Sequence, residues 1–318
     1  MNYNIEKITT LIGARRIGNA DAQIGWLLTD SRSLCFPEET LFFALKTQRN
    51  DGHRYIADLY RRGVRNFVVT TVPAAPSLVR SDSIAASVES SAGLYPDANF
   101  LVVPSPLAAL QRLAERHRDE FNIPIVGITG SNGKTMVKEW LYQLLSPQFS
   151  VTRSPKSFNS QIGVPLSVWL LNEQTQVGLF EAGISEMGEM EALSDIIQPT
   201  IGVLTSLGAA HQENFRSLEE KCMEKMRLFD GAKVLAYNSD DDIVSRCIRR
   251  SGFKGEKIGW SRENISAPLY IEAATTTHSP LPSLQVTYIY KGTREQYSLP
   301  FFDEASLQCS FACAAVAL

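Results

Sequence analysis

Residues 127–135, which read GITGSNGKT, have the composition of a loop that binds phosphate groups. Glycines let backbone N–H groups approach oxyanions closely, and they allow left-handed dihedral angles. Lys134 can bridge terminal phosphates, and the hydroxyl of Thr135 can bind Mg²⁺. The strict pattern G-x-x-x-x-G-K-S/T is not met, because Ile128 stands where its first glycine belongs. A glycine-rich turn before a helix is the alternative interpretation.

Four further side chains could carry chemistry. Glu181 ends an apolar run, and a carboxylate beside a phosphate loop can hold Mg²⁺, which prefers oxygen ligands. A turn residue or a salt-bridge partner is the alternative for this glutamate. His211 is a loop histidine, a type that is usually structural or solvated. Lys221 and Lys225 are four residues apart on a predicted helix and share one face, which could also be a solvated basic stripe.

An alternation of short apolar runs with helix-like segments begins at residue 123 and would position these side chains. Strands are predicted at 123–128, 148–153, 176–181, 200–205 and 232–237. Helices are predicted at 134–146, 163–172, 186–197, 217–229 and 240–250. This order predicts right-handed βαβ units and a mostly parallel sheet covered on both faces. Ligands of such sheets lie beyond the carboxyl ends of the strands.

The remaining parts of the chain have other patterns. The region before residue 105 is mixed, with predicted strands at 41–45, 67–71 and 100–103 and helical segments at 5–12 and 53–62. A helical stretch at 107–117 leads into the next domain. Residues 73–99 read as a surface loop or insertion, those after 265 as antiparallel strands, and 309–318 as an apolar helix. We therefore predict an α/β protein with a small mixed domain, 1–104, and a second domain with a mostly parallel sheet, 105–318.

Composition restricts the class of protein. The net charge of −3, without a basic block, argues against a nucleic-acid-binding surface. Five scattered cysteines indicate reduced thiols in a cytosolic protein. The N-terminus lacks a basic region followed by an apolar run, so no signal peptide is predicted. The longest apolar run, 162–171, is too short to span a bilayer. We expect a cytoplasmic monomer.

The phosphate loop resembles the ATP loop of the Mur ligases and of their folylpolyglutamate synthase relatives, whose form is G-x-T-G-S/T-x-G-K-T/S. In that form Gly127 and Gly130 take the place of the missing first glycine. The resemblance implies a P-loop ATPase domain. It also implies that ATP is bound by Gly130, Ser131, Asn132, Gly133, Lys134 and Thr135.

The same family implies roles for the other candidates. The stretch GLFEAG matches a motif with a magnesium-binding glutamate, here Glu181, and AAHQENF matches one whose histidine, here His211, helps to bind a second metal. A family lysine that CO₂ converts to a carbamate aligns with Lys225. The resemblance thus implies that Mg²⁺ is held by Thr135, Glu181, His211 and carbamoylated Lys225. Lys134, His211 and Lys225 would be the catalytic groups.

Two segments agree only in part with the family. Residues 154–167, SPKSFNSQIGVPLS, resemble the segment that lies over the phosphates and the substrate; Asn159 is retained and is expected to contact substrate, whereas Ser160 replaces a second asparagine. Near the end of the chain, Gln308 and Cys309 stand where family members usually carry an asparagine near adenine. Recognition of adenine is therefore expected to differ.

Three stretches before residue 105 resemble the UDP-sugar-binding domain of the family member that adds D-alanyl-D-alanine. They are TDSR at 29–32, LFFALK at 41–46 and DGH at 51–53. Ser31 and Arg32 could form hydrogen bonds with a uridine or a diphosphate, and Lys46 is a further expected substrate contact. A Ser-Arg turn between strands is the alternative interpretation.

The resemblance implies an ATP-dependent amide-bond ligase of peptidoglycan precursor synthesis. ATP would phosphorylate UDP-MurNAc-tripeptide, and the amine of D-Ala-D-Ala would attack the acyl phosphate. Alternatives are a diaminopimelate- or lysine-adding Mur ligase, folylpolyglutamate synthase, or an inactive nucleotide- or UDP-sugar-binding module. Residues 210–213, AHQE, differ from the D-H-x-D of the amino-acid-adding paralogue and favour the first function. The C-terminal α/β domain of the family has no counterpart in these 318 residues, so we expect them not to ligate alone.

Overall fold

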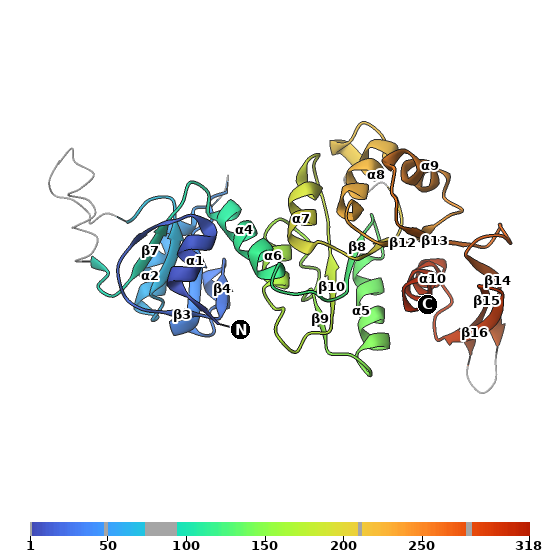
Figure 1. Cartoon of the computed structure of the whole chain (residues 1–318), viewed down its shortest axis with the longest axis horizontal. Coiled ribbons are helices and arrows are strands. Elements are labelled where there is room, and N and C mark those ends of the chain that lie inside the picture. The colour runs from blue at the N-terminus through green and yellow to red at the C-terminus, as the bar shows by residue number, and fades with distance from the viewer. Residues whose placement is uncertain (1, 48–49, 74–93, 209–211, 278–281) are drawn as a thin grey trace. The chain divides into compact units, whose positions relative to one another are not determined.

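The computed structural model of the protein describes residues 2–47, 50–73, 94–208, 212–277 and 282–318 (Figure 1). The chain forms two compact units, 1–117 and 118–318. No helix among the described residues has both the length and the apolar character needed to cross a membrane.

Helix α4 (Pro106–Arg118) lies almost entirely in the first unit, although it follows the domain boundary predicted at 104/105. Its last turn contacts the start of the chain, because Tyr3 Oη and His117 Nδ1 share a hydrogen bond of 2.9 Å. Most of the surface loop expected at 73–99 lies outside the described residues.

Among the residues described in the first unit, five strands form a sheet with the order β2-β7-β6-β5-β4, in which β4 to β7 are parallel and β2 is antiparallel. Strands β5 and β6 are buried along their whole length, as parallel strands covered on both faces are. The strands of this sheet are β2 (Arg15–Ile17), β4 (Trp26–Leu28), β5 (Thr40–Phe43), β6 (Asn66–Val69) and β7 (Asn99–Val102). A short pair, β1 (Tyr3–Asn4) and β3 (Gln23–Ile24), lies apart from it.

The helices of the first unit agree with the predicted pattern. Helix α1 begins after Asn4, whose side chain accepts a hydrogen bond from the Glu6 N–H, and ends at Gly13 in a left-handed conformation. The helical segment predicted at 53–62 divides into a 3₁₀ turn and a short α-helix. The helical elements are α1 (Ile5–Ile12), η1 (Ser31–Ser33), η2 (Pro37–Glu39), η3 (Gly52–Tyr55) and α2 (Ile56–Arg61).

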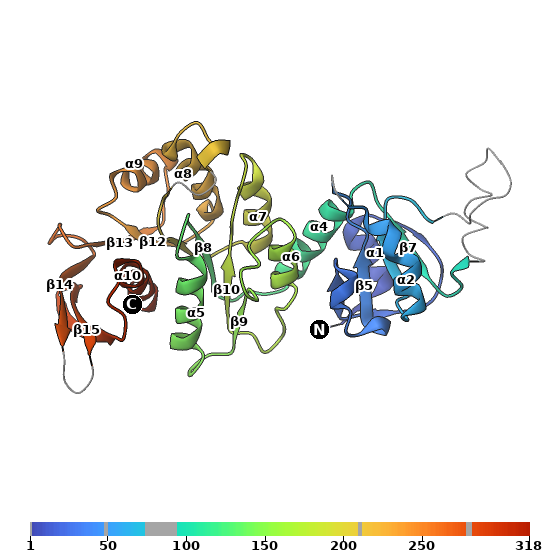
Figure 2. The ribbon, with the colours of Figure 1, turned by 180° about the vertical axis from the view of Figure 1, so that it is seen from behind.

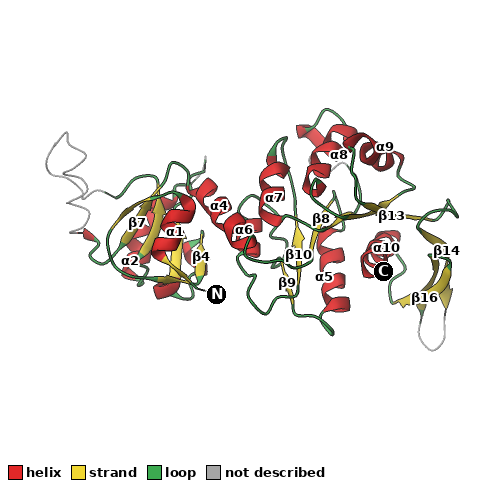
Figure 3. Ribbon diagram, in the orientation of Figure 1, coloured by secondary structure: helices red, strands yellow, loops and turns green. Residues whose placement is uncertain are grey.

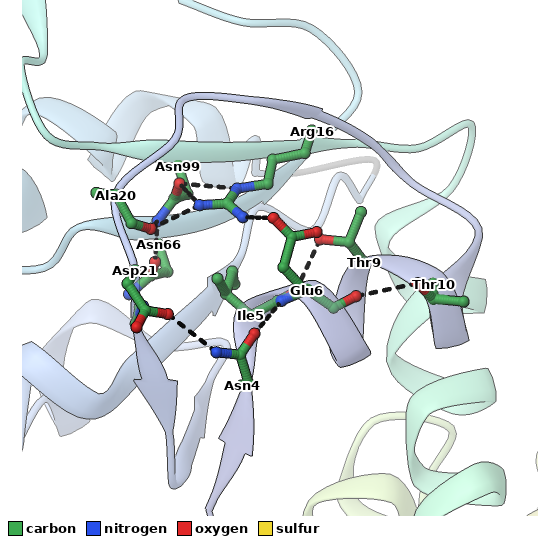
Figure 4. Close-up of polar contacts among 11 residues, drawn as sticks. Asn4, Ile5, Glu6, Thr9, Thr10, Arg16, Ala20, Asp21, Asn66 and Asn99 are labelled. Carbon is green, nitrogen blue, oxygen red and sulfur yellow. Dashed lines mark hydrogen bonds and ion pairs between the residues drawn. The ribbon is translucent and has the colours of Figure 1, made fainter.

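A buried amide connects the edge of this sheet to the first helix (Figure 4). The fully buried Asn99 accepts hydrogen bonds from Arg16 Nε (3.0 Å) and Nη2 (2.8 Å), and it donates to Ala20 O (3.0 Å) and Asn66 Oδ1 (2.8 Å). The guanidinium of Arg16 also pairs with the carboxylate of Glu6. The side chain of Asn99 therefore uses both ends of its amide to satisfy groups on β2, β6 and the loop before β3.

The second unit is built on a nine-stranded sheet, counted over the described residues, with the order β16-β15-β14-β13-β12-β11-β8-β10-β9. The strands from β9 to β14 in this order are parallel, and β14, β15 and β16 are antiparallel, as predicted. Strand β13 was not predicted, because its only apolar residues are Ile258 and Trp260. The strands are β8 (Ile125–Thr129), β9 (Val151–Arg153), β10 (Val177–Glu181), β11 (Ile201–Leu204), β12 (Val234–Asn238), β13 (Glu256–Ser261), β14 (Leu269–Thr277), β15 (Ser283–Tyr290) and β16 (Thr293–Leu299).

Helices alternate with the strands of the second unit (Figure 3). Five lie close to their predicted positions, although α6 ends four residues early. The last helix begins before its predicted start, because Asp303 caps it by accepting a hydrogen bond from the Ser306 N–H (2.8 Å). The helical elements of the second unit are α5 (Lys134–Leu145), α6 (Gly163–Val168), α7 (Glu189–Ile197), η4 (Gln212–Asn214), α8 (Leu218–Met226), η5 (Arg227–Phe229), α9 (Asp242–Ser251) and α10 (Glu304–Ala317).

The two faces of this sheet are covered by different segments. Helices α5 and α10 lie side by side (Figures 1 and 2) and share one core with Val126 and Ile128 of β8. Side chains of a strand alternate between the two faces of the sheet, so a side chain at Gly127 would point to the face opposite that of Val126 and Ile128. A Cβ on it would lie 2.8 Å from Pro199 and 3.5 Å from Leu228 of η5. Gly127 therefore makes room for packing rather than for phosphate, which corrects the role expected for it.

We expect Asn99→Leu to lower the free energy of unfolding of the first unit by about 2–4 kcal/mol, because it leaves the buried amide of Asn66 without this hydrogen-bond donor and removes one acceptor from the partly buried guanidinium of Arg16. Urea unfolding followed by circular dichroism measures this. The exposed Asn19 gives a matched control, and Asn19→Leu should change the same free energy by less than about 0.5 kcal/mol. Equal stability of the two variants contradicts the role given to the buried amide.

Candidate active site

The phosphate loop lies at the point where the strand order reverses, since β8 is flanked by β10 on one side and β11 on the other. Gly130 and Gly133 have φ angles of 149° and 84°. A Cβ on Gly130 would lie 1.9 Å from Thr205 Oγ1, and one on Gly133 would lie 2.9 Å from Cys309 Sγ. Both positions thus need glycine for conformation and for space, and helix α5 starts directly after them.

The segment that follows β11 holds the loop in shape. Ser131 Oγ accepts a hydrogen bond from the Gly208 N–H (2.9 Å), and the Ser131 N–H donates to Ser206 O (2.6 Å). Thr205 Oγ1 donates to Asn132 O (2.6 Å). These bonds engage the side chain of Ser131 and the backbone of Asn132, and they leave the exposed side chain of Asn132 at the rim of the loop.

Lys134 folds back over the loop that precedes it. Its Nζ donates hydrogen bonds to Gly130 O (2.8 Å) and Ser131 O (3.3 Å). Burial lowers its pKa, the carboxylate of Glu181 acts in the opposite direction, and the charge of Lys221 lowers the pKa further. The ammonium group of Lys134 lies beside the amino end of α5. A phosphate there would meet both the charge of the ammonium and the positive end of the helix dipole.

A hydroxyl and a carboxylate face each other beside the loop. Glu181 is fully buried at the carboxyl end of β10, in register with Ile128 of β8, and its Oε2 accepts a hydrogen bond from Thr135 Oγ1 (3.0 Å). Asn159 Nδ2 lies 3.5 Å from the same oxygen. Hard oxygen donors of this kind fit Mg²⁺. The described residues hold no cluster of three or more His, Cys, Asp or Glu side chains suited to a metal.

The two lysines of helix α8 reach the same loop and do not form the solvated stripe that was the alternative. Lys225 Nζ donates to Gly130 O (3.2 Å) and Lys221 Nζ to Gly208 O (2.7 Å), and both side chains are buried. Burial, with the positive charges of Lys134 and Lys221, lowers the pKa of Lys225 to about 7. Lys225 is thus poised between ammonium and amine near neutral pH.

Local contacts fix helix α8 in this position. Ser217 caps its start by accepting a hydrogen bond from the Glu220 N–H (3.0 Å). The buried Glu224 accepts hydrogen bonds from the N–H groups of Gly188 (2.8 Å) and Met190 (3.1 Å) at the start of α7. His211, expected near Lys225 as a metal ligand, lies outside the described residues.

The substrate residues expected in the first unit follow the carboxyl ends of two neighbouring parallel strands, β4 and β5. Asp30 caps the turn that contains Ser31 and Arg32 and pairs with Arg32 (Oδ2 to Nη2, 2.6 Å), which lowers the pKa of Asp30. The side chain of Arg32 is 88% exposed and Lys46 is also exposed. These cations are thus accessible at the edge where ligands of parallel sheets bind.

The DGH stretch has a structural role in the first unit. Asp51 Oδ1 contacts the backbone N–H (3.0 Å) and Nδ1 (2.6 Å) of His53. Nε2 of His53 accepts a hydrogen bond from the Thr70 N–H (3.0 Å), so Nδ1 carries the proton that is donated to Asp51. The histidine therefore fastens the turn after β5 to the end of β6.

The region expected near adenine is occupied by contacts within the second unit. Gln308 Oε1 accepts a hydrogen bond from Trp260 Nε1 (3.2 Å), and its Nε2 donates to Glu304 (2.8 Å). Cys309 is buried with its Sγ 4.0 Å from Gly133 O, and burial raises the pKa of the thiol to about 11. Cys309 therefore supports the phosphate loop as an uncharged thiol.

One residue of the site was not identified from the sequence. Lys138 is fully buried, with its Nζ 3.0 Å from Glu181 Oε1. The available signal was its spacing, because Lys134 and Lys138 are four residues apart and share one face of α5.

A family model described as the Mur ligase middle domain matches residues 128–317. The chain belongs to the Mur ligase family. Among its relatives, the UDP-N-acetylmuramoyl-tripeptide–D-alanyl-D-alanine ligase of Bacillus subtilis is 31% identical over 266 residues, which are 82% of this chain and 53% of that protein. The ligase of the same name from Haemophilus influenzae is 28% identical and covers 90% of this chain and 60% of its own. The chain thus spans about half the length of the curated relatives that it matches.

Solved structures of Mur ligases share the fold. A crystal structure of MurF from Acinetobacter baumannii covers the whole chain and 65% of its own length, with a TM-score of 0.83 and 21% identity. A 2,6-diaminopimelate ligase structure gives a TM-score of 0.60 at 16% identity. The mixed α/β fold with a mostly parallel sheet and the MurF-type resemblance are therefore confirmed.

We expect Lys225→Met to raise the free energy of unfolding of the nucleotide-free protein by roughly 1–3 kcal/mol below pH 7. The pKa of this lysine is near 7 in the folded chain and near 10.5 when unfolded. Below pH 7 the charged lysine therefore destabilises the folded state by its full amount, and this destabilisation decreases as the pH rises to 10.5. The gain should therefore shrink as pH rises. Denaturant unfolding between pH 6 and 10 tests this, with the exposed Lys254→Met as the control. A gain independent of pH counts against the lowered pKa.

Proposed function

We propose that this chain provides the UDP-MurNAc-tripeptide-binding and ATP-binding parts of a MurF-type ligase. The whole enzyme would add D-alanyl-D-alanine to UDP-MurNAc-tripeptide through an acyl phosphate, in peptidoglycan precursor synthesis. The observation that carries the proposal is the Thr135 hydroxyl facing the buried Glu181 carboxylate beside a glycine loop with Lys134 over it. This arrangement suits transfer of the terminal phosphate of ATP to a carboxylate.

The loop and its lysine would bind and orient the phosphates. The N–H groups between Gly130 and Thr135 and the amino end of α5 supply fixed dipoles, and Lys134 exchanges the carbonyls of Gly130 and Ser131 for phosphate oxygens. Catalysis is then mainly neutralisation of charge and positioning, because phosphoryl transfer demands little covalent chemistry from the protein.

Oxygen ligands from two elements would hold Mg²⁺, namely Thr135 at the start of α5 and Glu181 at the end of β10. The bound ion would neutralise negative charge on the transferring phosphoryl group. The low pKa of Lys225 supports its proposed carbamoylation, since the neutral amine is the form that reacts with CO₂. The carbamate would replace one of the positive charges near the loop with oxygen ligands. These oxygens and His211 would together hold a second Mg²⁺.

Four residues are proposed to contact the acceptor substrate. Ser31, Arg32 and Lys46 would bind the UDP-sugar portion, in keeping with the exposure of both cations. Asn159, beside Glu181, would contact the substrate near the transferred phosphate. We further propose a monomer in the cytoplasm; the five free thiols are compatible with a reducing compartment.

The experiment measures ADP release by the whole gene product with ATP, Mg²⁺ and UDP-MurNAc-tripeptide, with and without D-Ala-D-Ala. We expect release to depend on the dipeptide, and Lys134→Ala and Thr135→Ala to lower kcat/KM by about 10²–10⁴-fold. Lys254→Ala, at an exposed position of the same unit, should retain wild-type turnover. Wild-type turnover by Lys134→Ala, or release that never depends on the dipeptide, overturns the proposal.

A further inference from the structure

Helix α5 contributes a second lysine to the site, one turn beyond the phosphate-loop lysine. Lys138 has no exposed side-chain surface, although a buried ammonium is costly unless it is paired. We propose that Lys138 is a positioning residue, which holds the carboxylate of Glu181 turned toward Thr135. The inference rests on the proposed function, because it concerns the magnesium ligand of that site.

The two oxygens of Glu181 have different neighbours. Oε1 lies 3.0 Å from the Nζ of Lys138, and Oε2 accepts a hydrogen bond from Thr135 (3.0 Å) with the amide of Asn159 at 3.5 Å. Oε1 receives no well-aligned hydrogen bond from any described residue, so its contact with Lys138 is mainly one of charge. The ammonium of Lys138 thus fixes Oε1 and leaves Oε2 facing Thr135, the other proposed magnesium ligand.

Backbone groups keep the ammonium of Lys138 in place. Its Nζ donates a hydrogen bond to Ser154 O (2.8 Å) and another to Lys156 O. Ser154 in turn accepts a hydrogen bond through its Oγ from the Glu181 N–H (3.2 Å). Lys156 takes a left-handed φ of 47°, which is uncommon for a residue with a side chain and brings its carbonyl to the lysine. The pair is therefore enclosed by the segment between β9 and α6.

A second carboxylate shares the ammonium but not its environment. Glu139 Oε1 lies 3.1 Å from Lys138 Nζ, yet this side chain is 34% exposed and also pairs with Arg153 (3.1 Å). Glu139 therefore has another cation and access to water, whereas Lys138 is the cation within salt-bridge distance of the buried Glu181 among the described residues. Loss of the Lys138 charge should consequently leave the carboxylate of Glu181, rather than that of Glu139, without a cation at salt-bridge distance.

The test measures ADP binding and steady-state ADP release by the whole gene product as free Mg²⁺ is varied. Lys138→Met keeps the length of the side chain and removes its charge. We expect the half-saturating Mg²⁺ concentration to rise about tenfold or more, because residues that orient a metal ligand typically contribute 10–100-fold to metal affinity. Binding of ADP without Mg²⁺ and kcat at saturating Mg²⁺ should stay within about threefold of wild type. Lys254→Met should match wild type in all three.

The double variant separates positioning from a general effect on folding. As a single variant, Glu181→Gln should raise the half-saturating Mg²⁺ concentration. Adding Lys138→Met to it should raise that concentration by less than about threefold more, because the ligand that Lys138 orients is already neutral. The double variant also removes both buried charges, so it can be measured even if Lys138→Met alone unfolds. Fully additive losses, or an unchanged Mg²⁺ requirement in Lys138→Met, overturn the inference. Wild type without Mg²⁺-dependent ADP release would instead overturn the proposed function.

Discussion

The proposed nucleotide site depends on an excess of positive charge around one backbone carbonyl. Gly130 O accepts hydrogen bonds from both Lys134 and Lys225, and Lys221 binds the neighbouring carbonyl of Gly208. Ammonium groups held this close repel one another, and burial removes the water that would screen them. The low pKa of Lys225 is one expression of this repulsion. An anion bound at the loop would offset this excess of positive charge, in keeping with the proposed binding of phosphate.

The parallel sheet determines which residues can meet at this point. Strands β8, β10 and β11 end at one edge, so the phosphate loop, Glu181 and the segment after β11 come together although they are up to 77 residues apart in the chain. The negative charge of Glu181 at the end of β10 then balances part of the excess from Lys134 and Lys138. Alternating positive and negative side chains at one sheet edge give a site that can hold both a phosphate and a cation.

The sequence predicted much of this arrangement, because the loop, the βαβ alternation and a strand ending in Glu181 are local patterns. Distances between segments were not predictable. The buried pairing of Lys138 with Glu181 joins residues 43 positions apart, and Gly127 proved to face Pro199 rather than phosphate. Strand β13 was missed because a strand with so few apolar residues has only a weak apolar pattern, although its last four residues are buried. The true start of α10 depended on a single capping residue, Asp303.

Helix α10 lies against the phosphate loop although it comes some 170 residues later in the chain. Cys309 contacts Gly133, and Cys313 approaches Val137 on the first turn of α5 (Sγ to O, 3.7 Å). During synthesis the loop and α5 emerge from the ribosome long before the helix that supports them, and closing so long a loop is slow. The apolar face of α5 that packs against α10 can therefore be covered only after that helix has been synthesised.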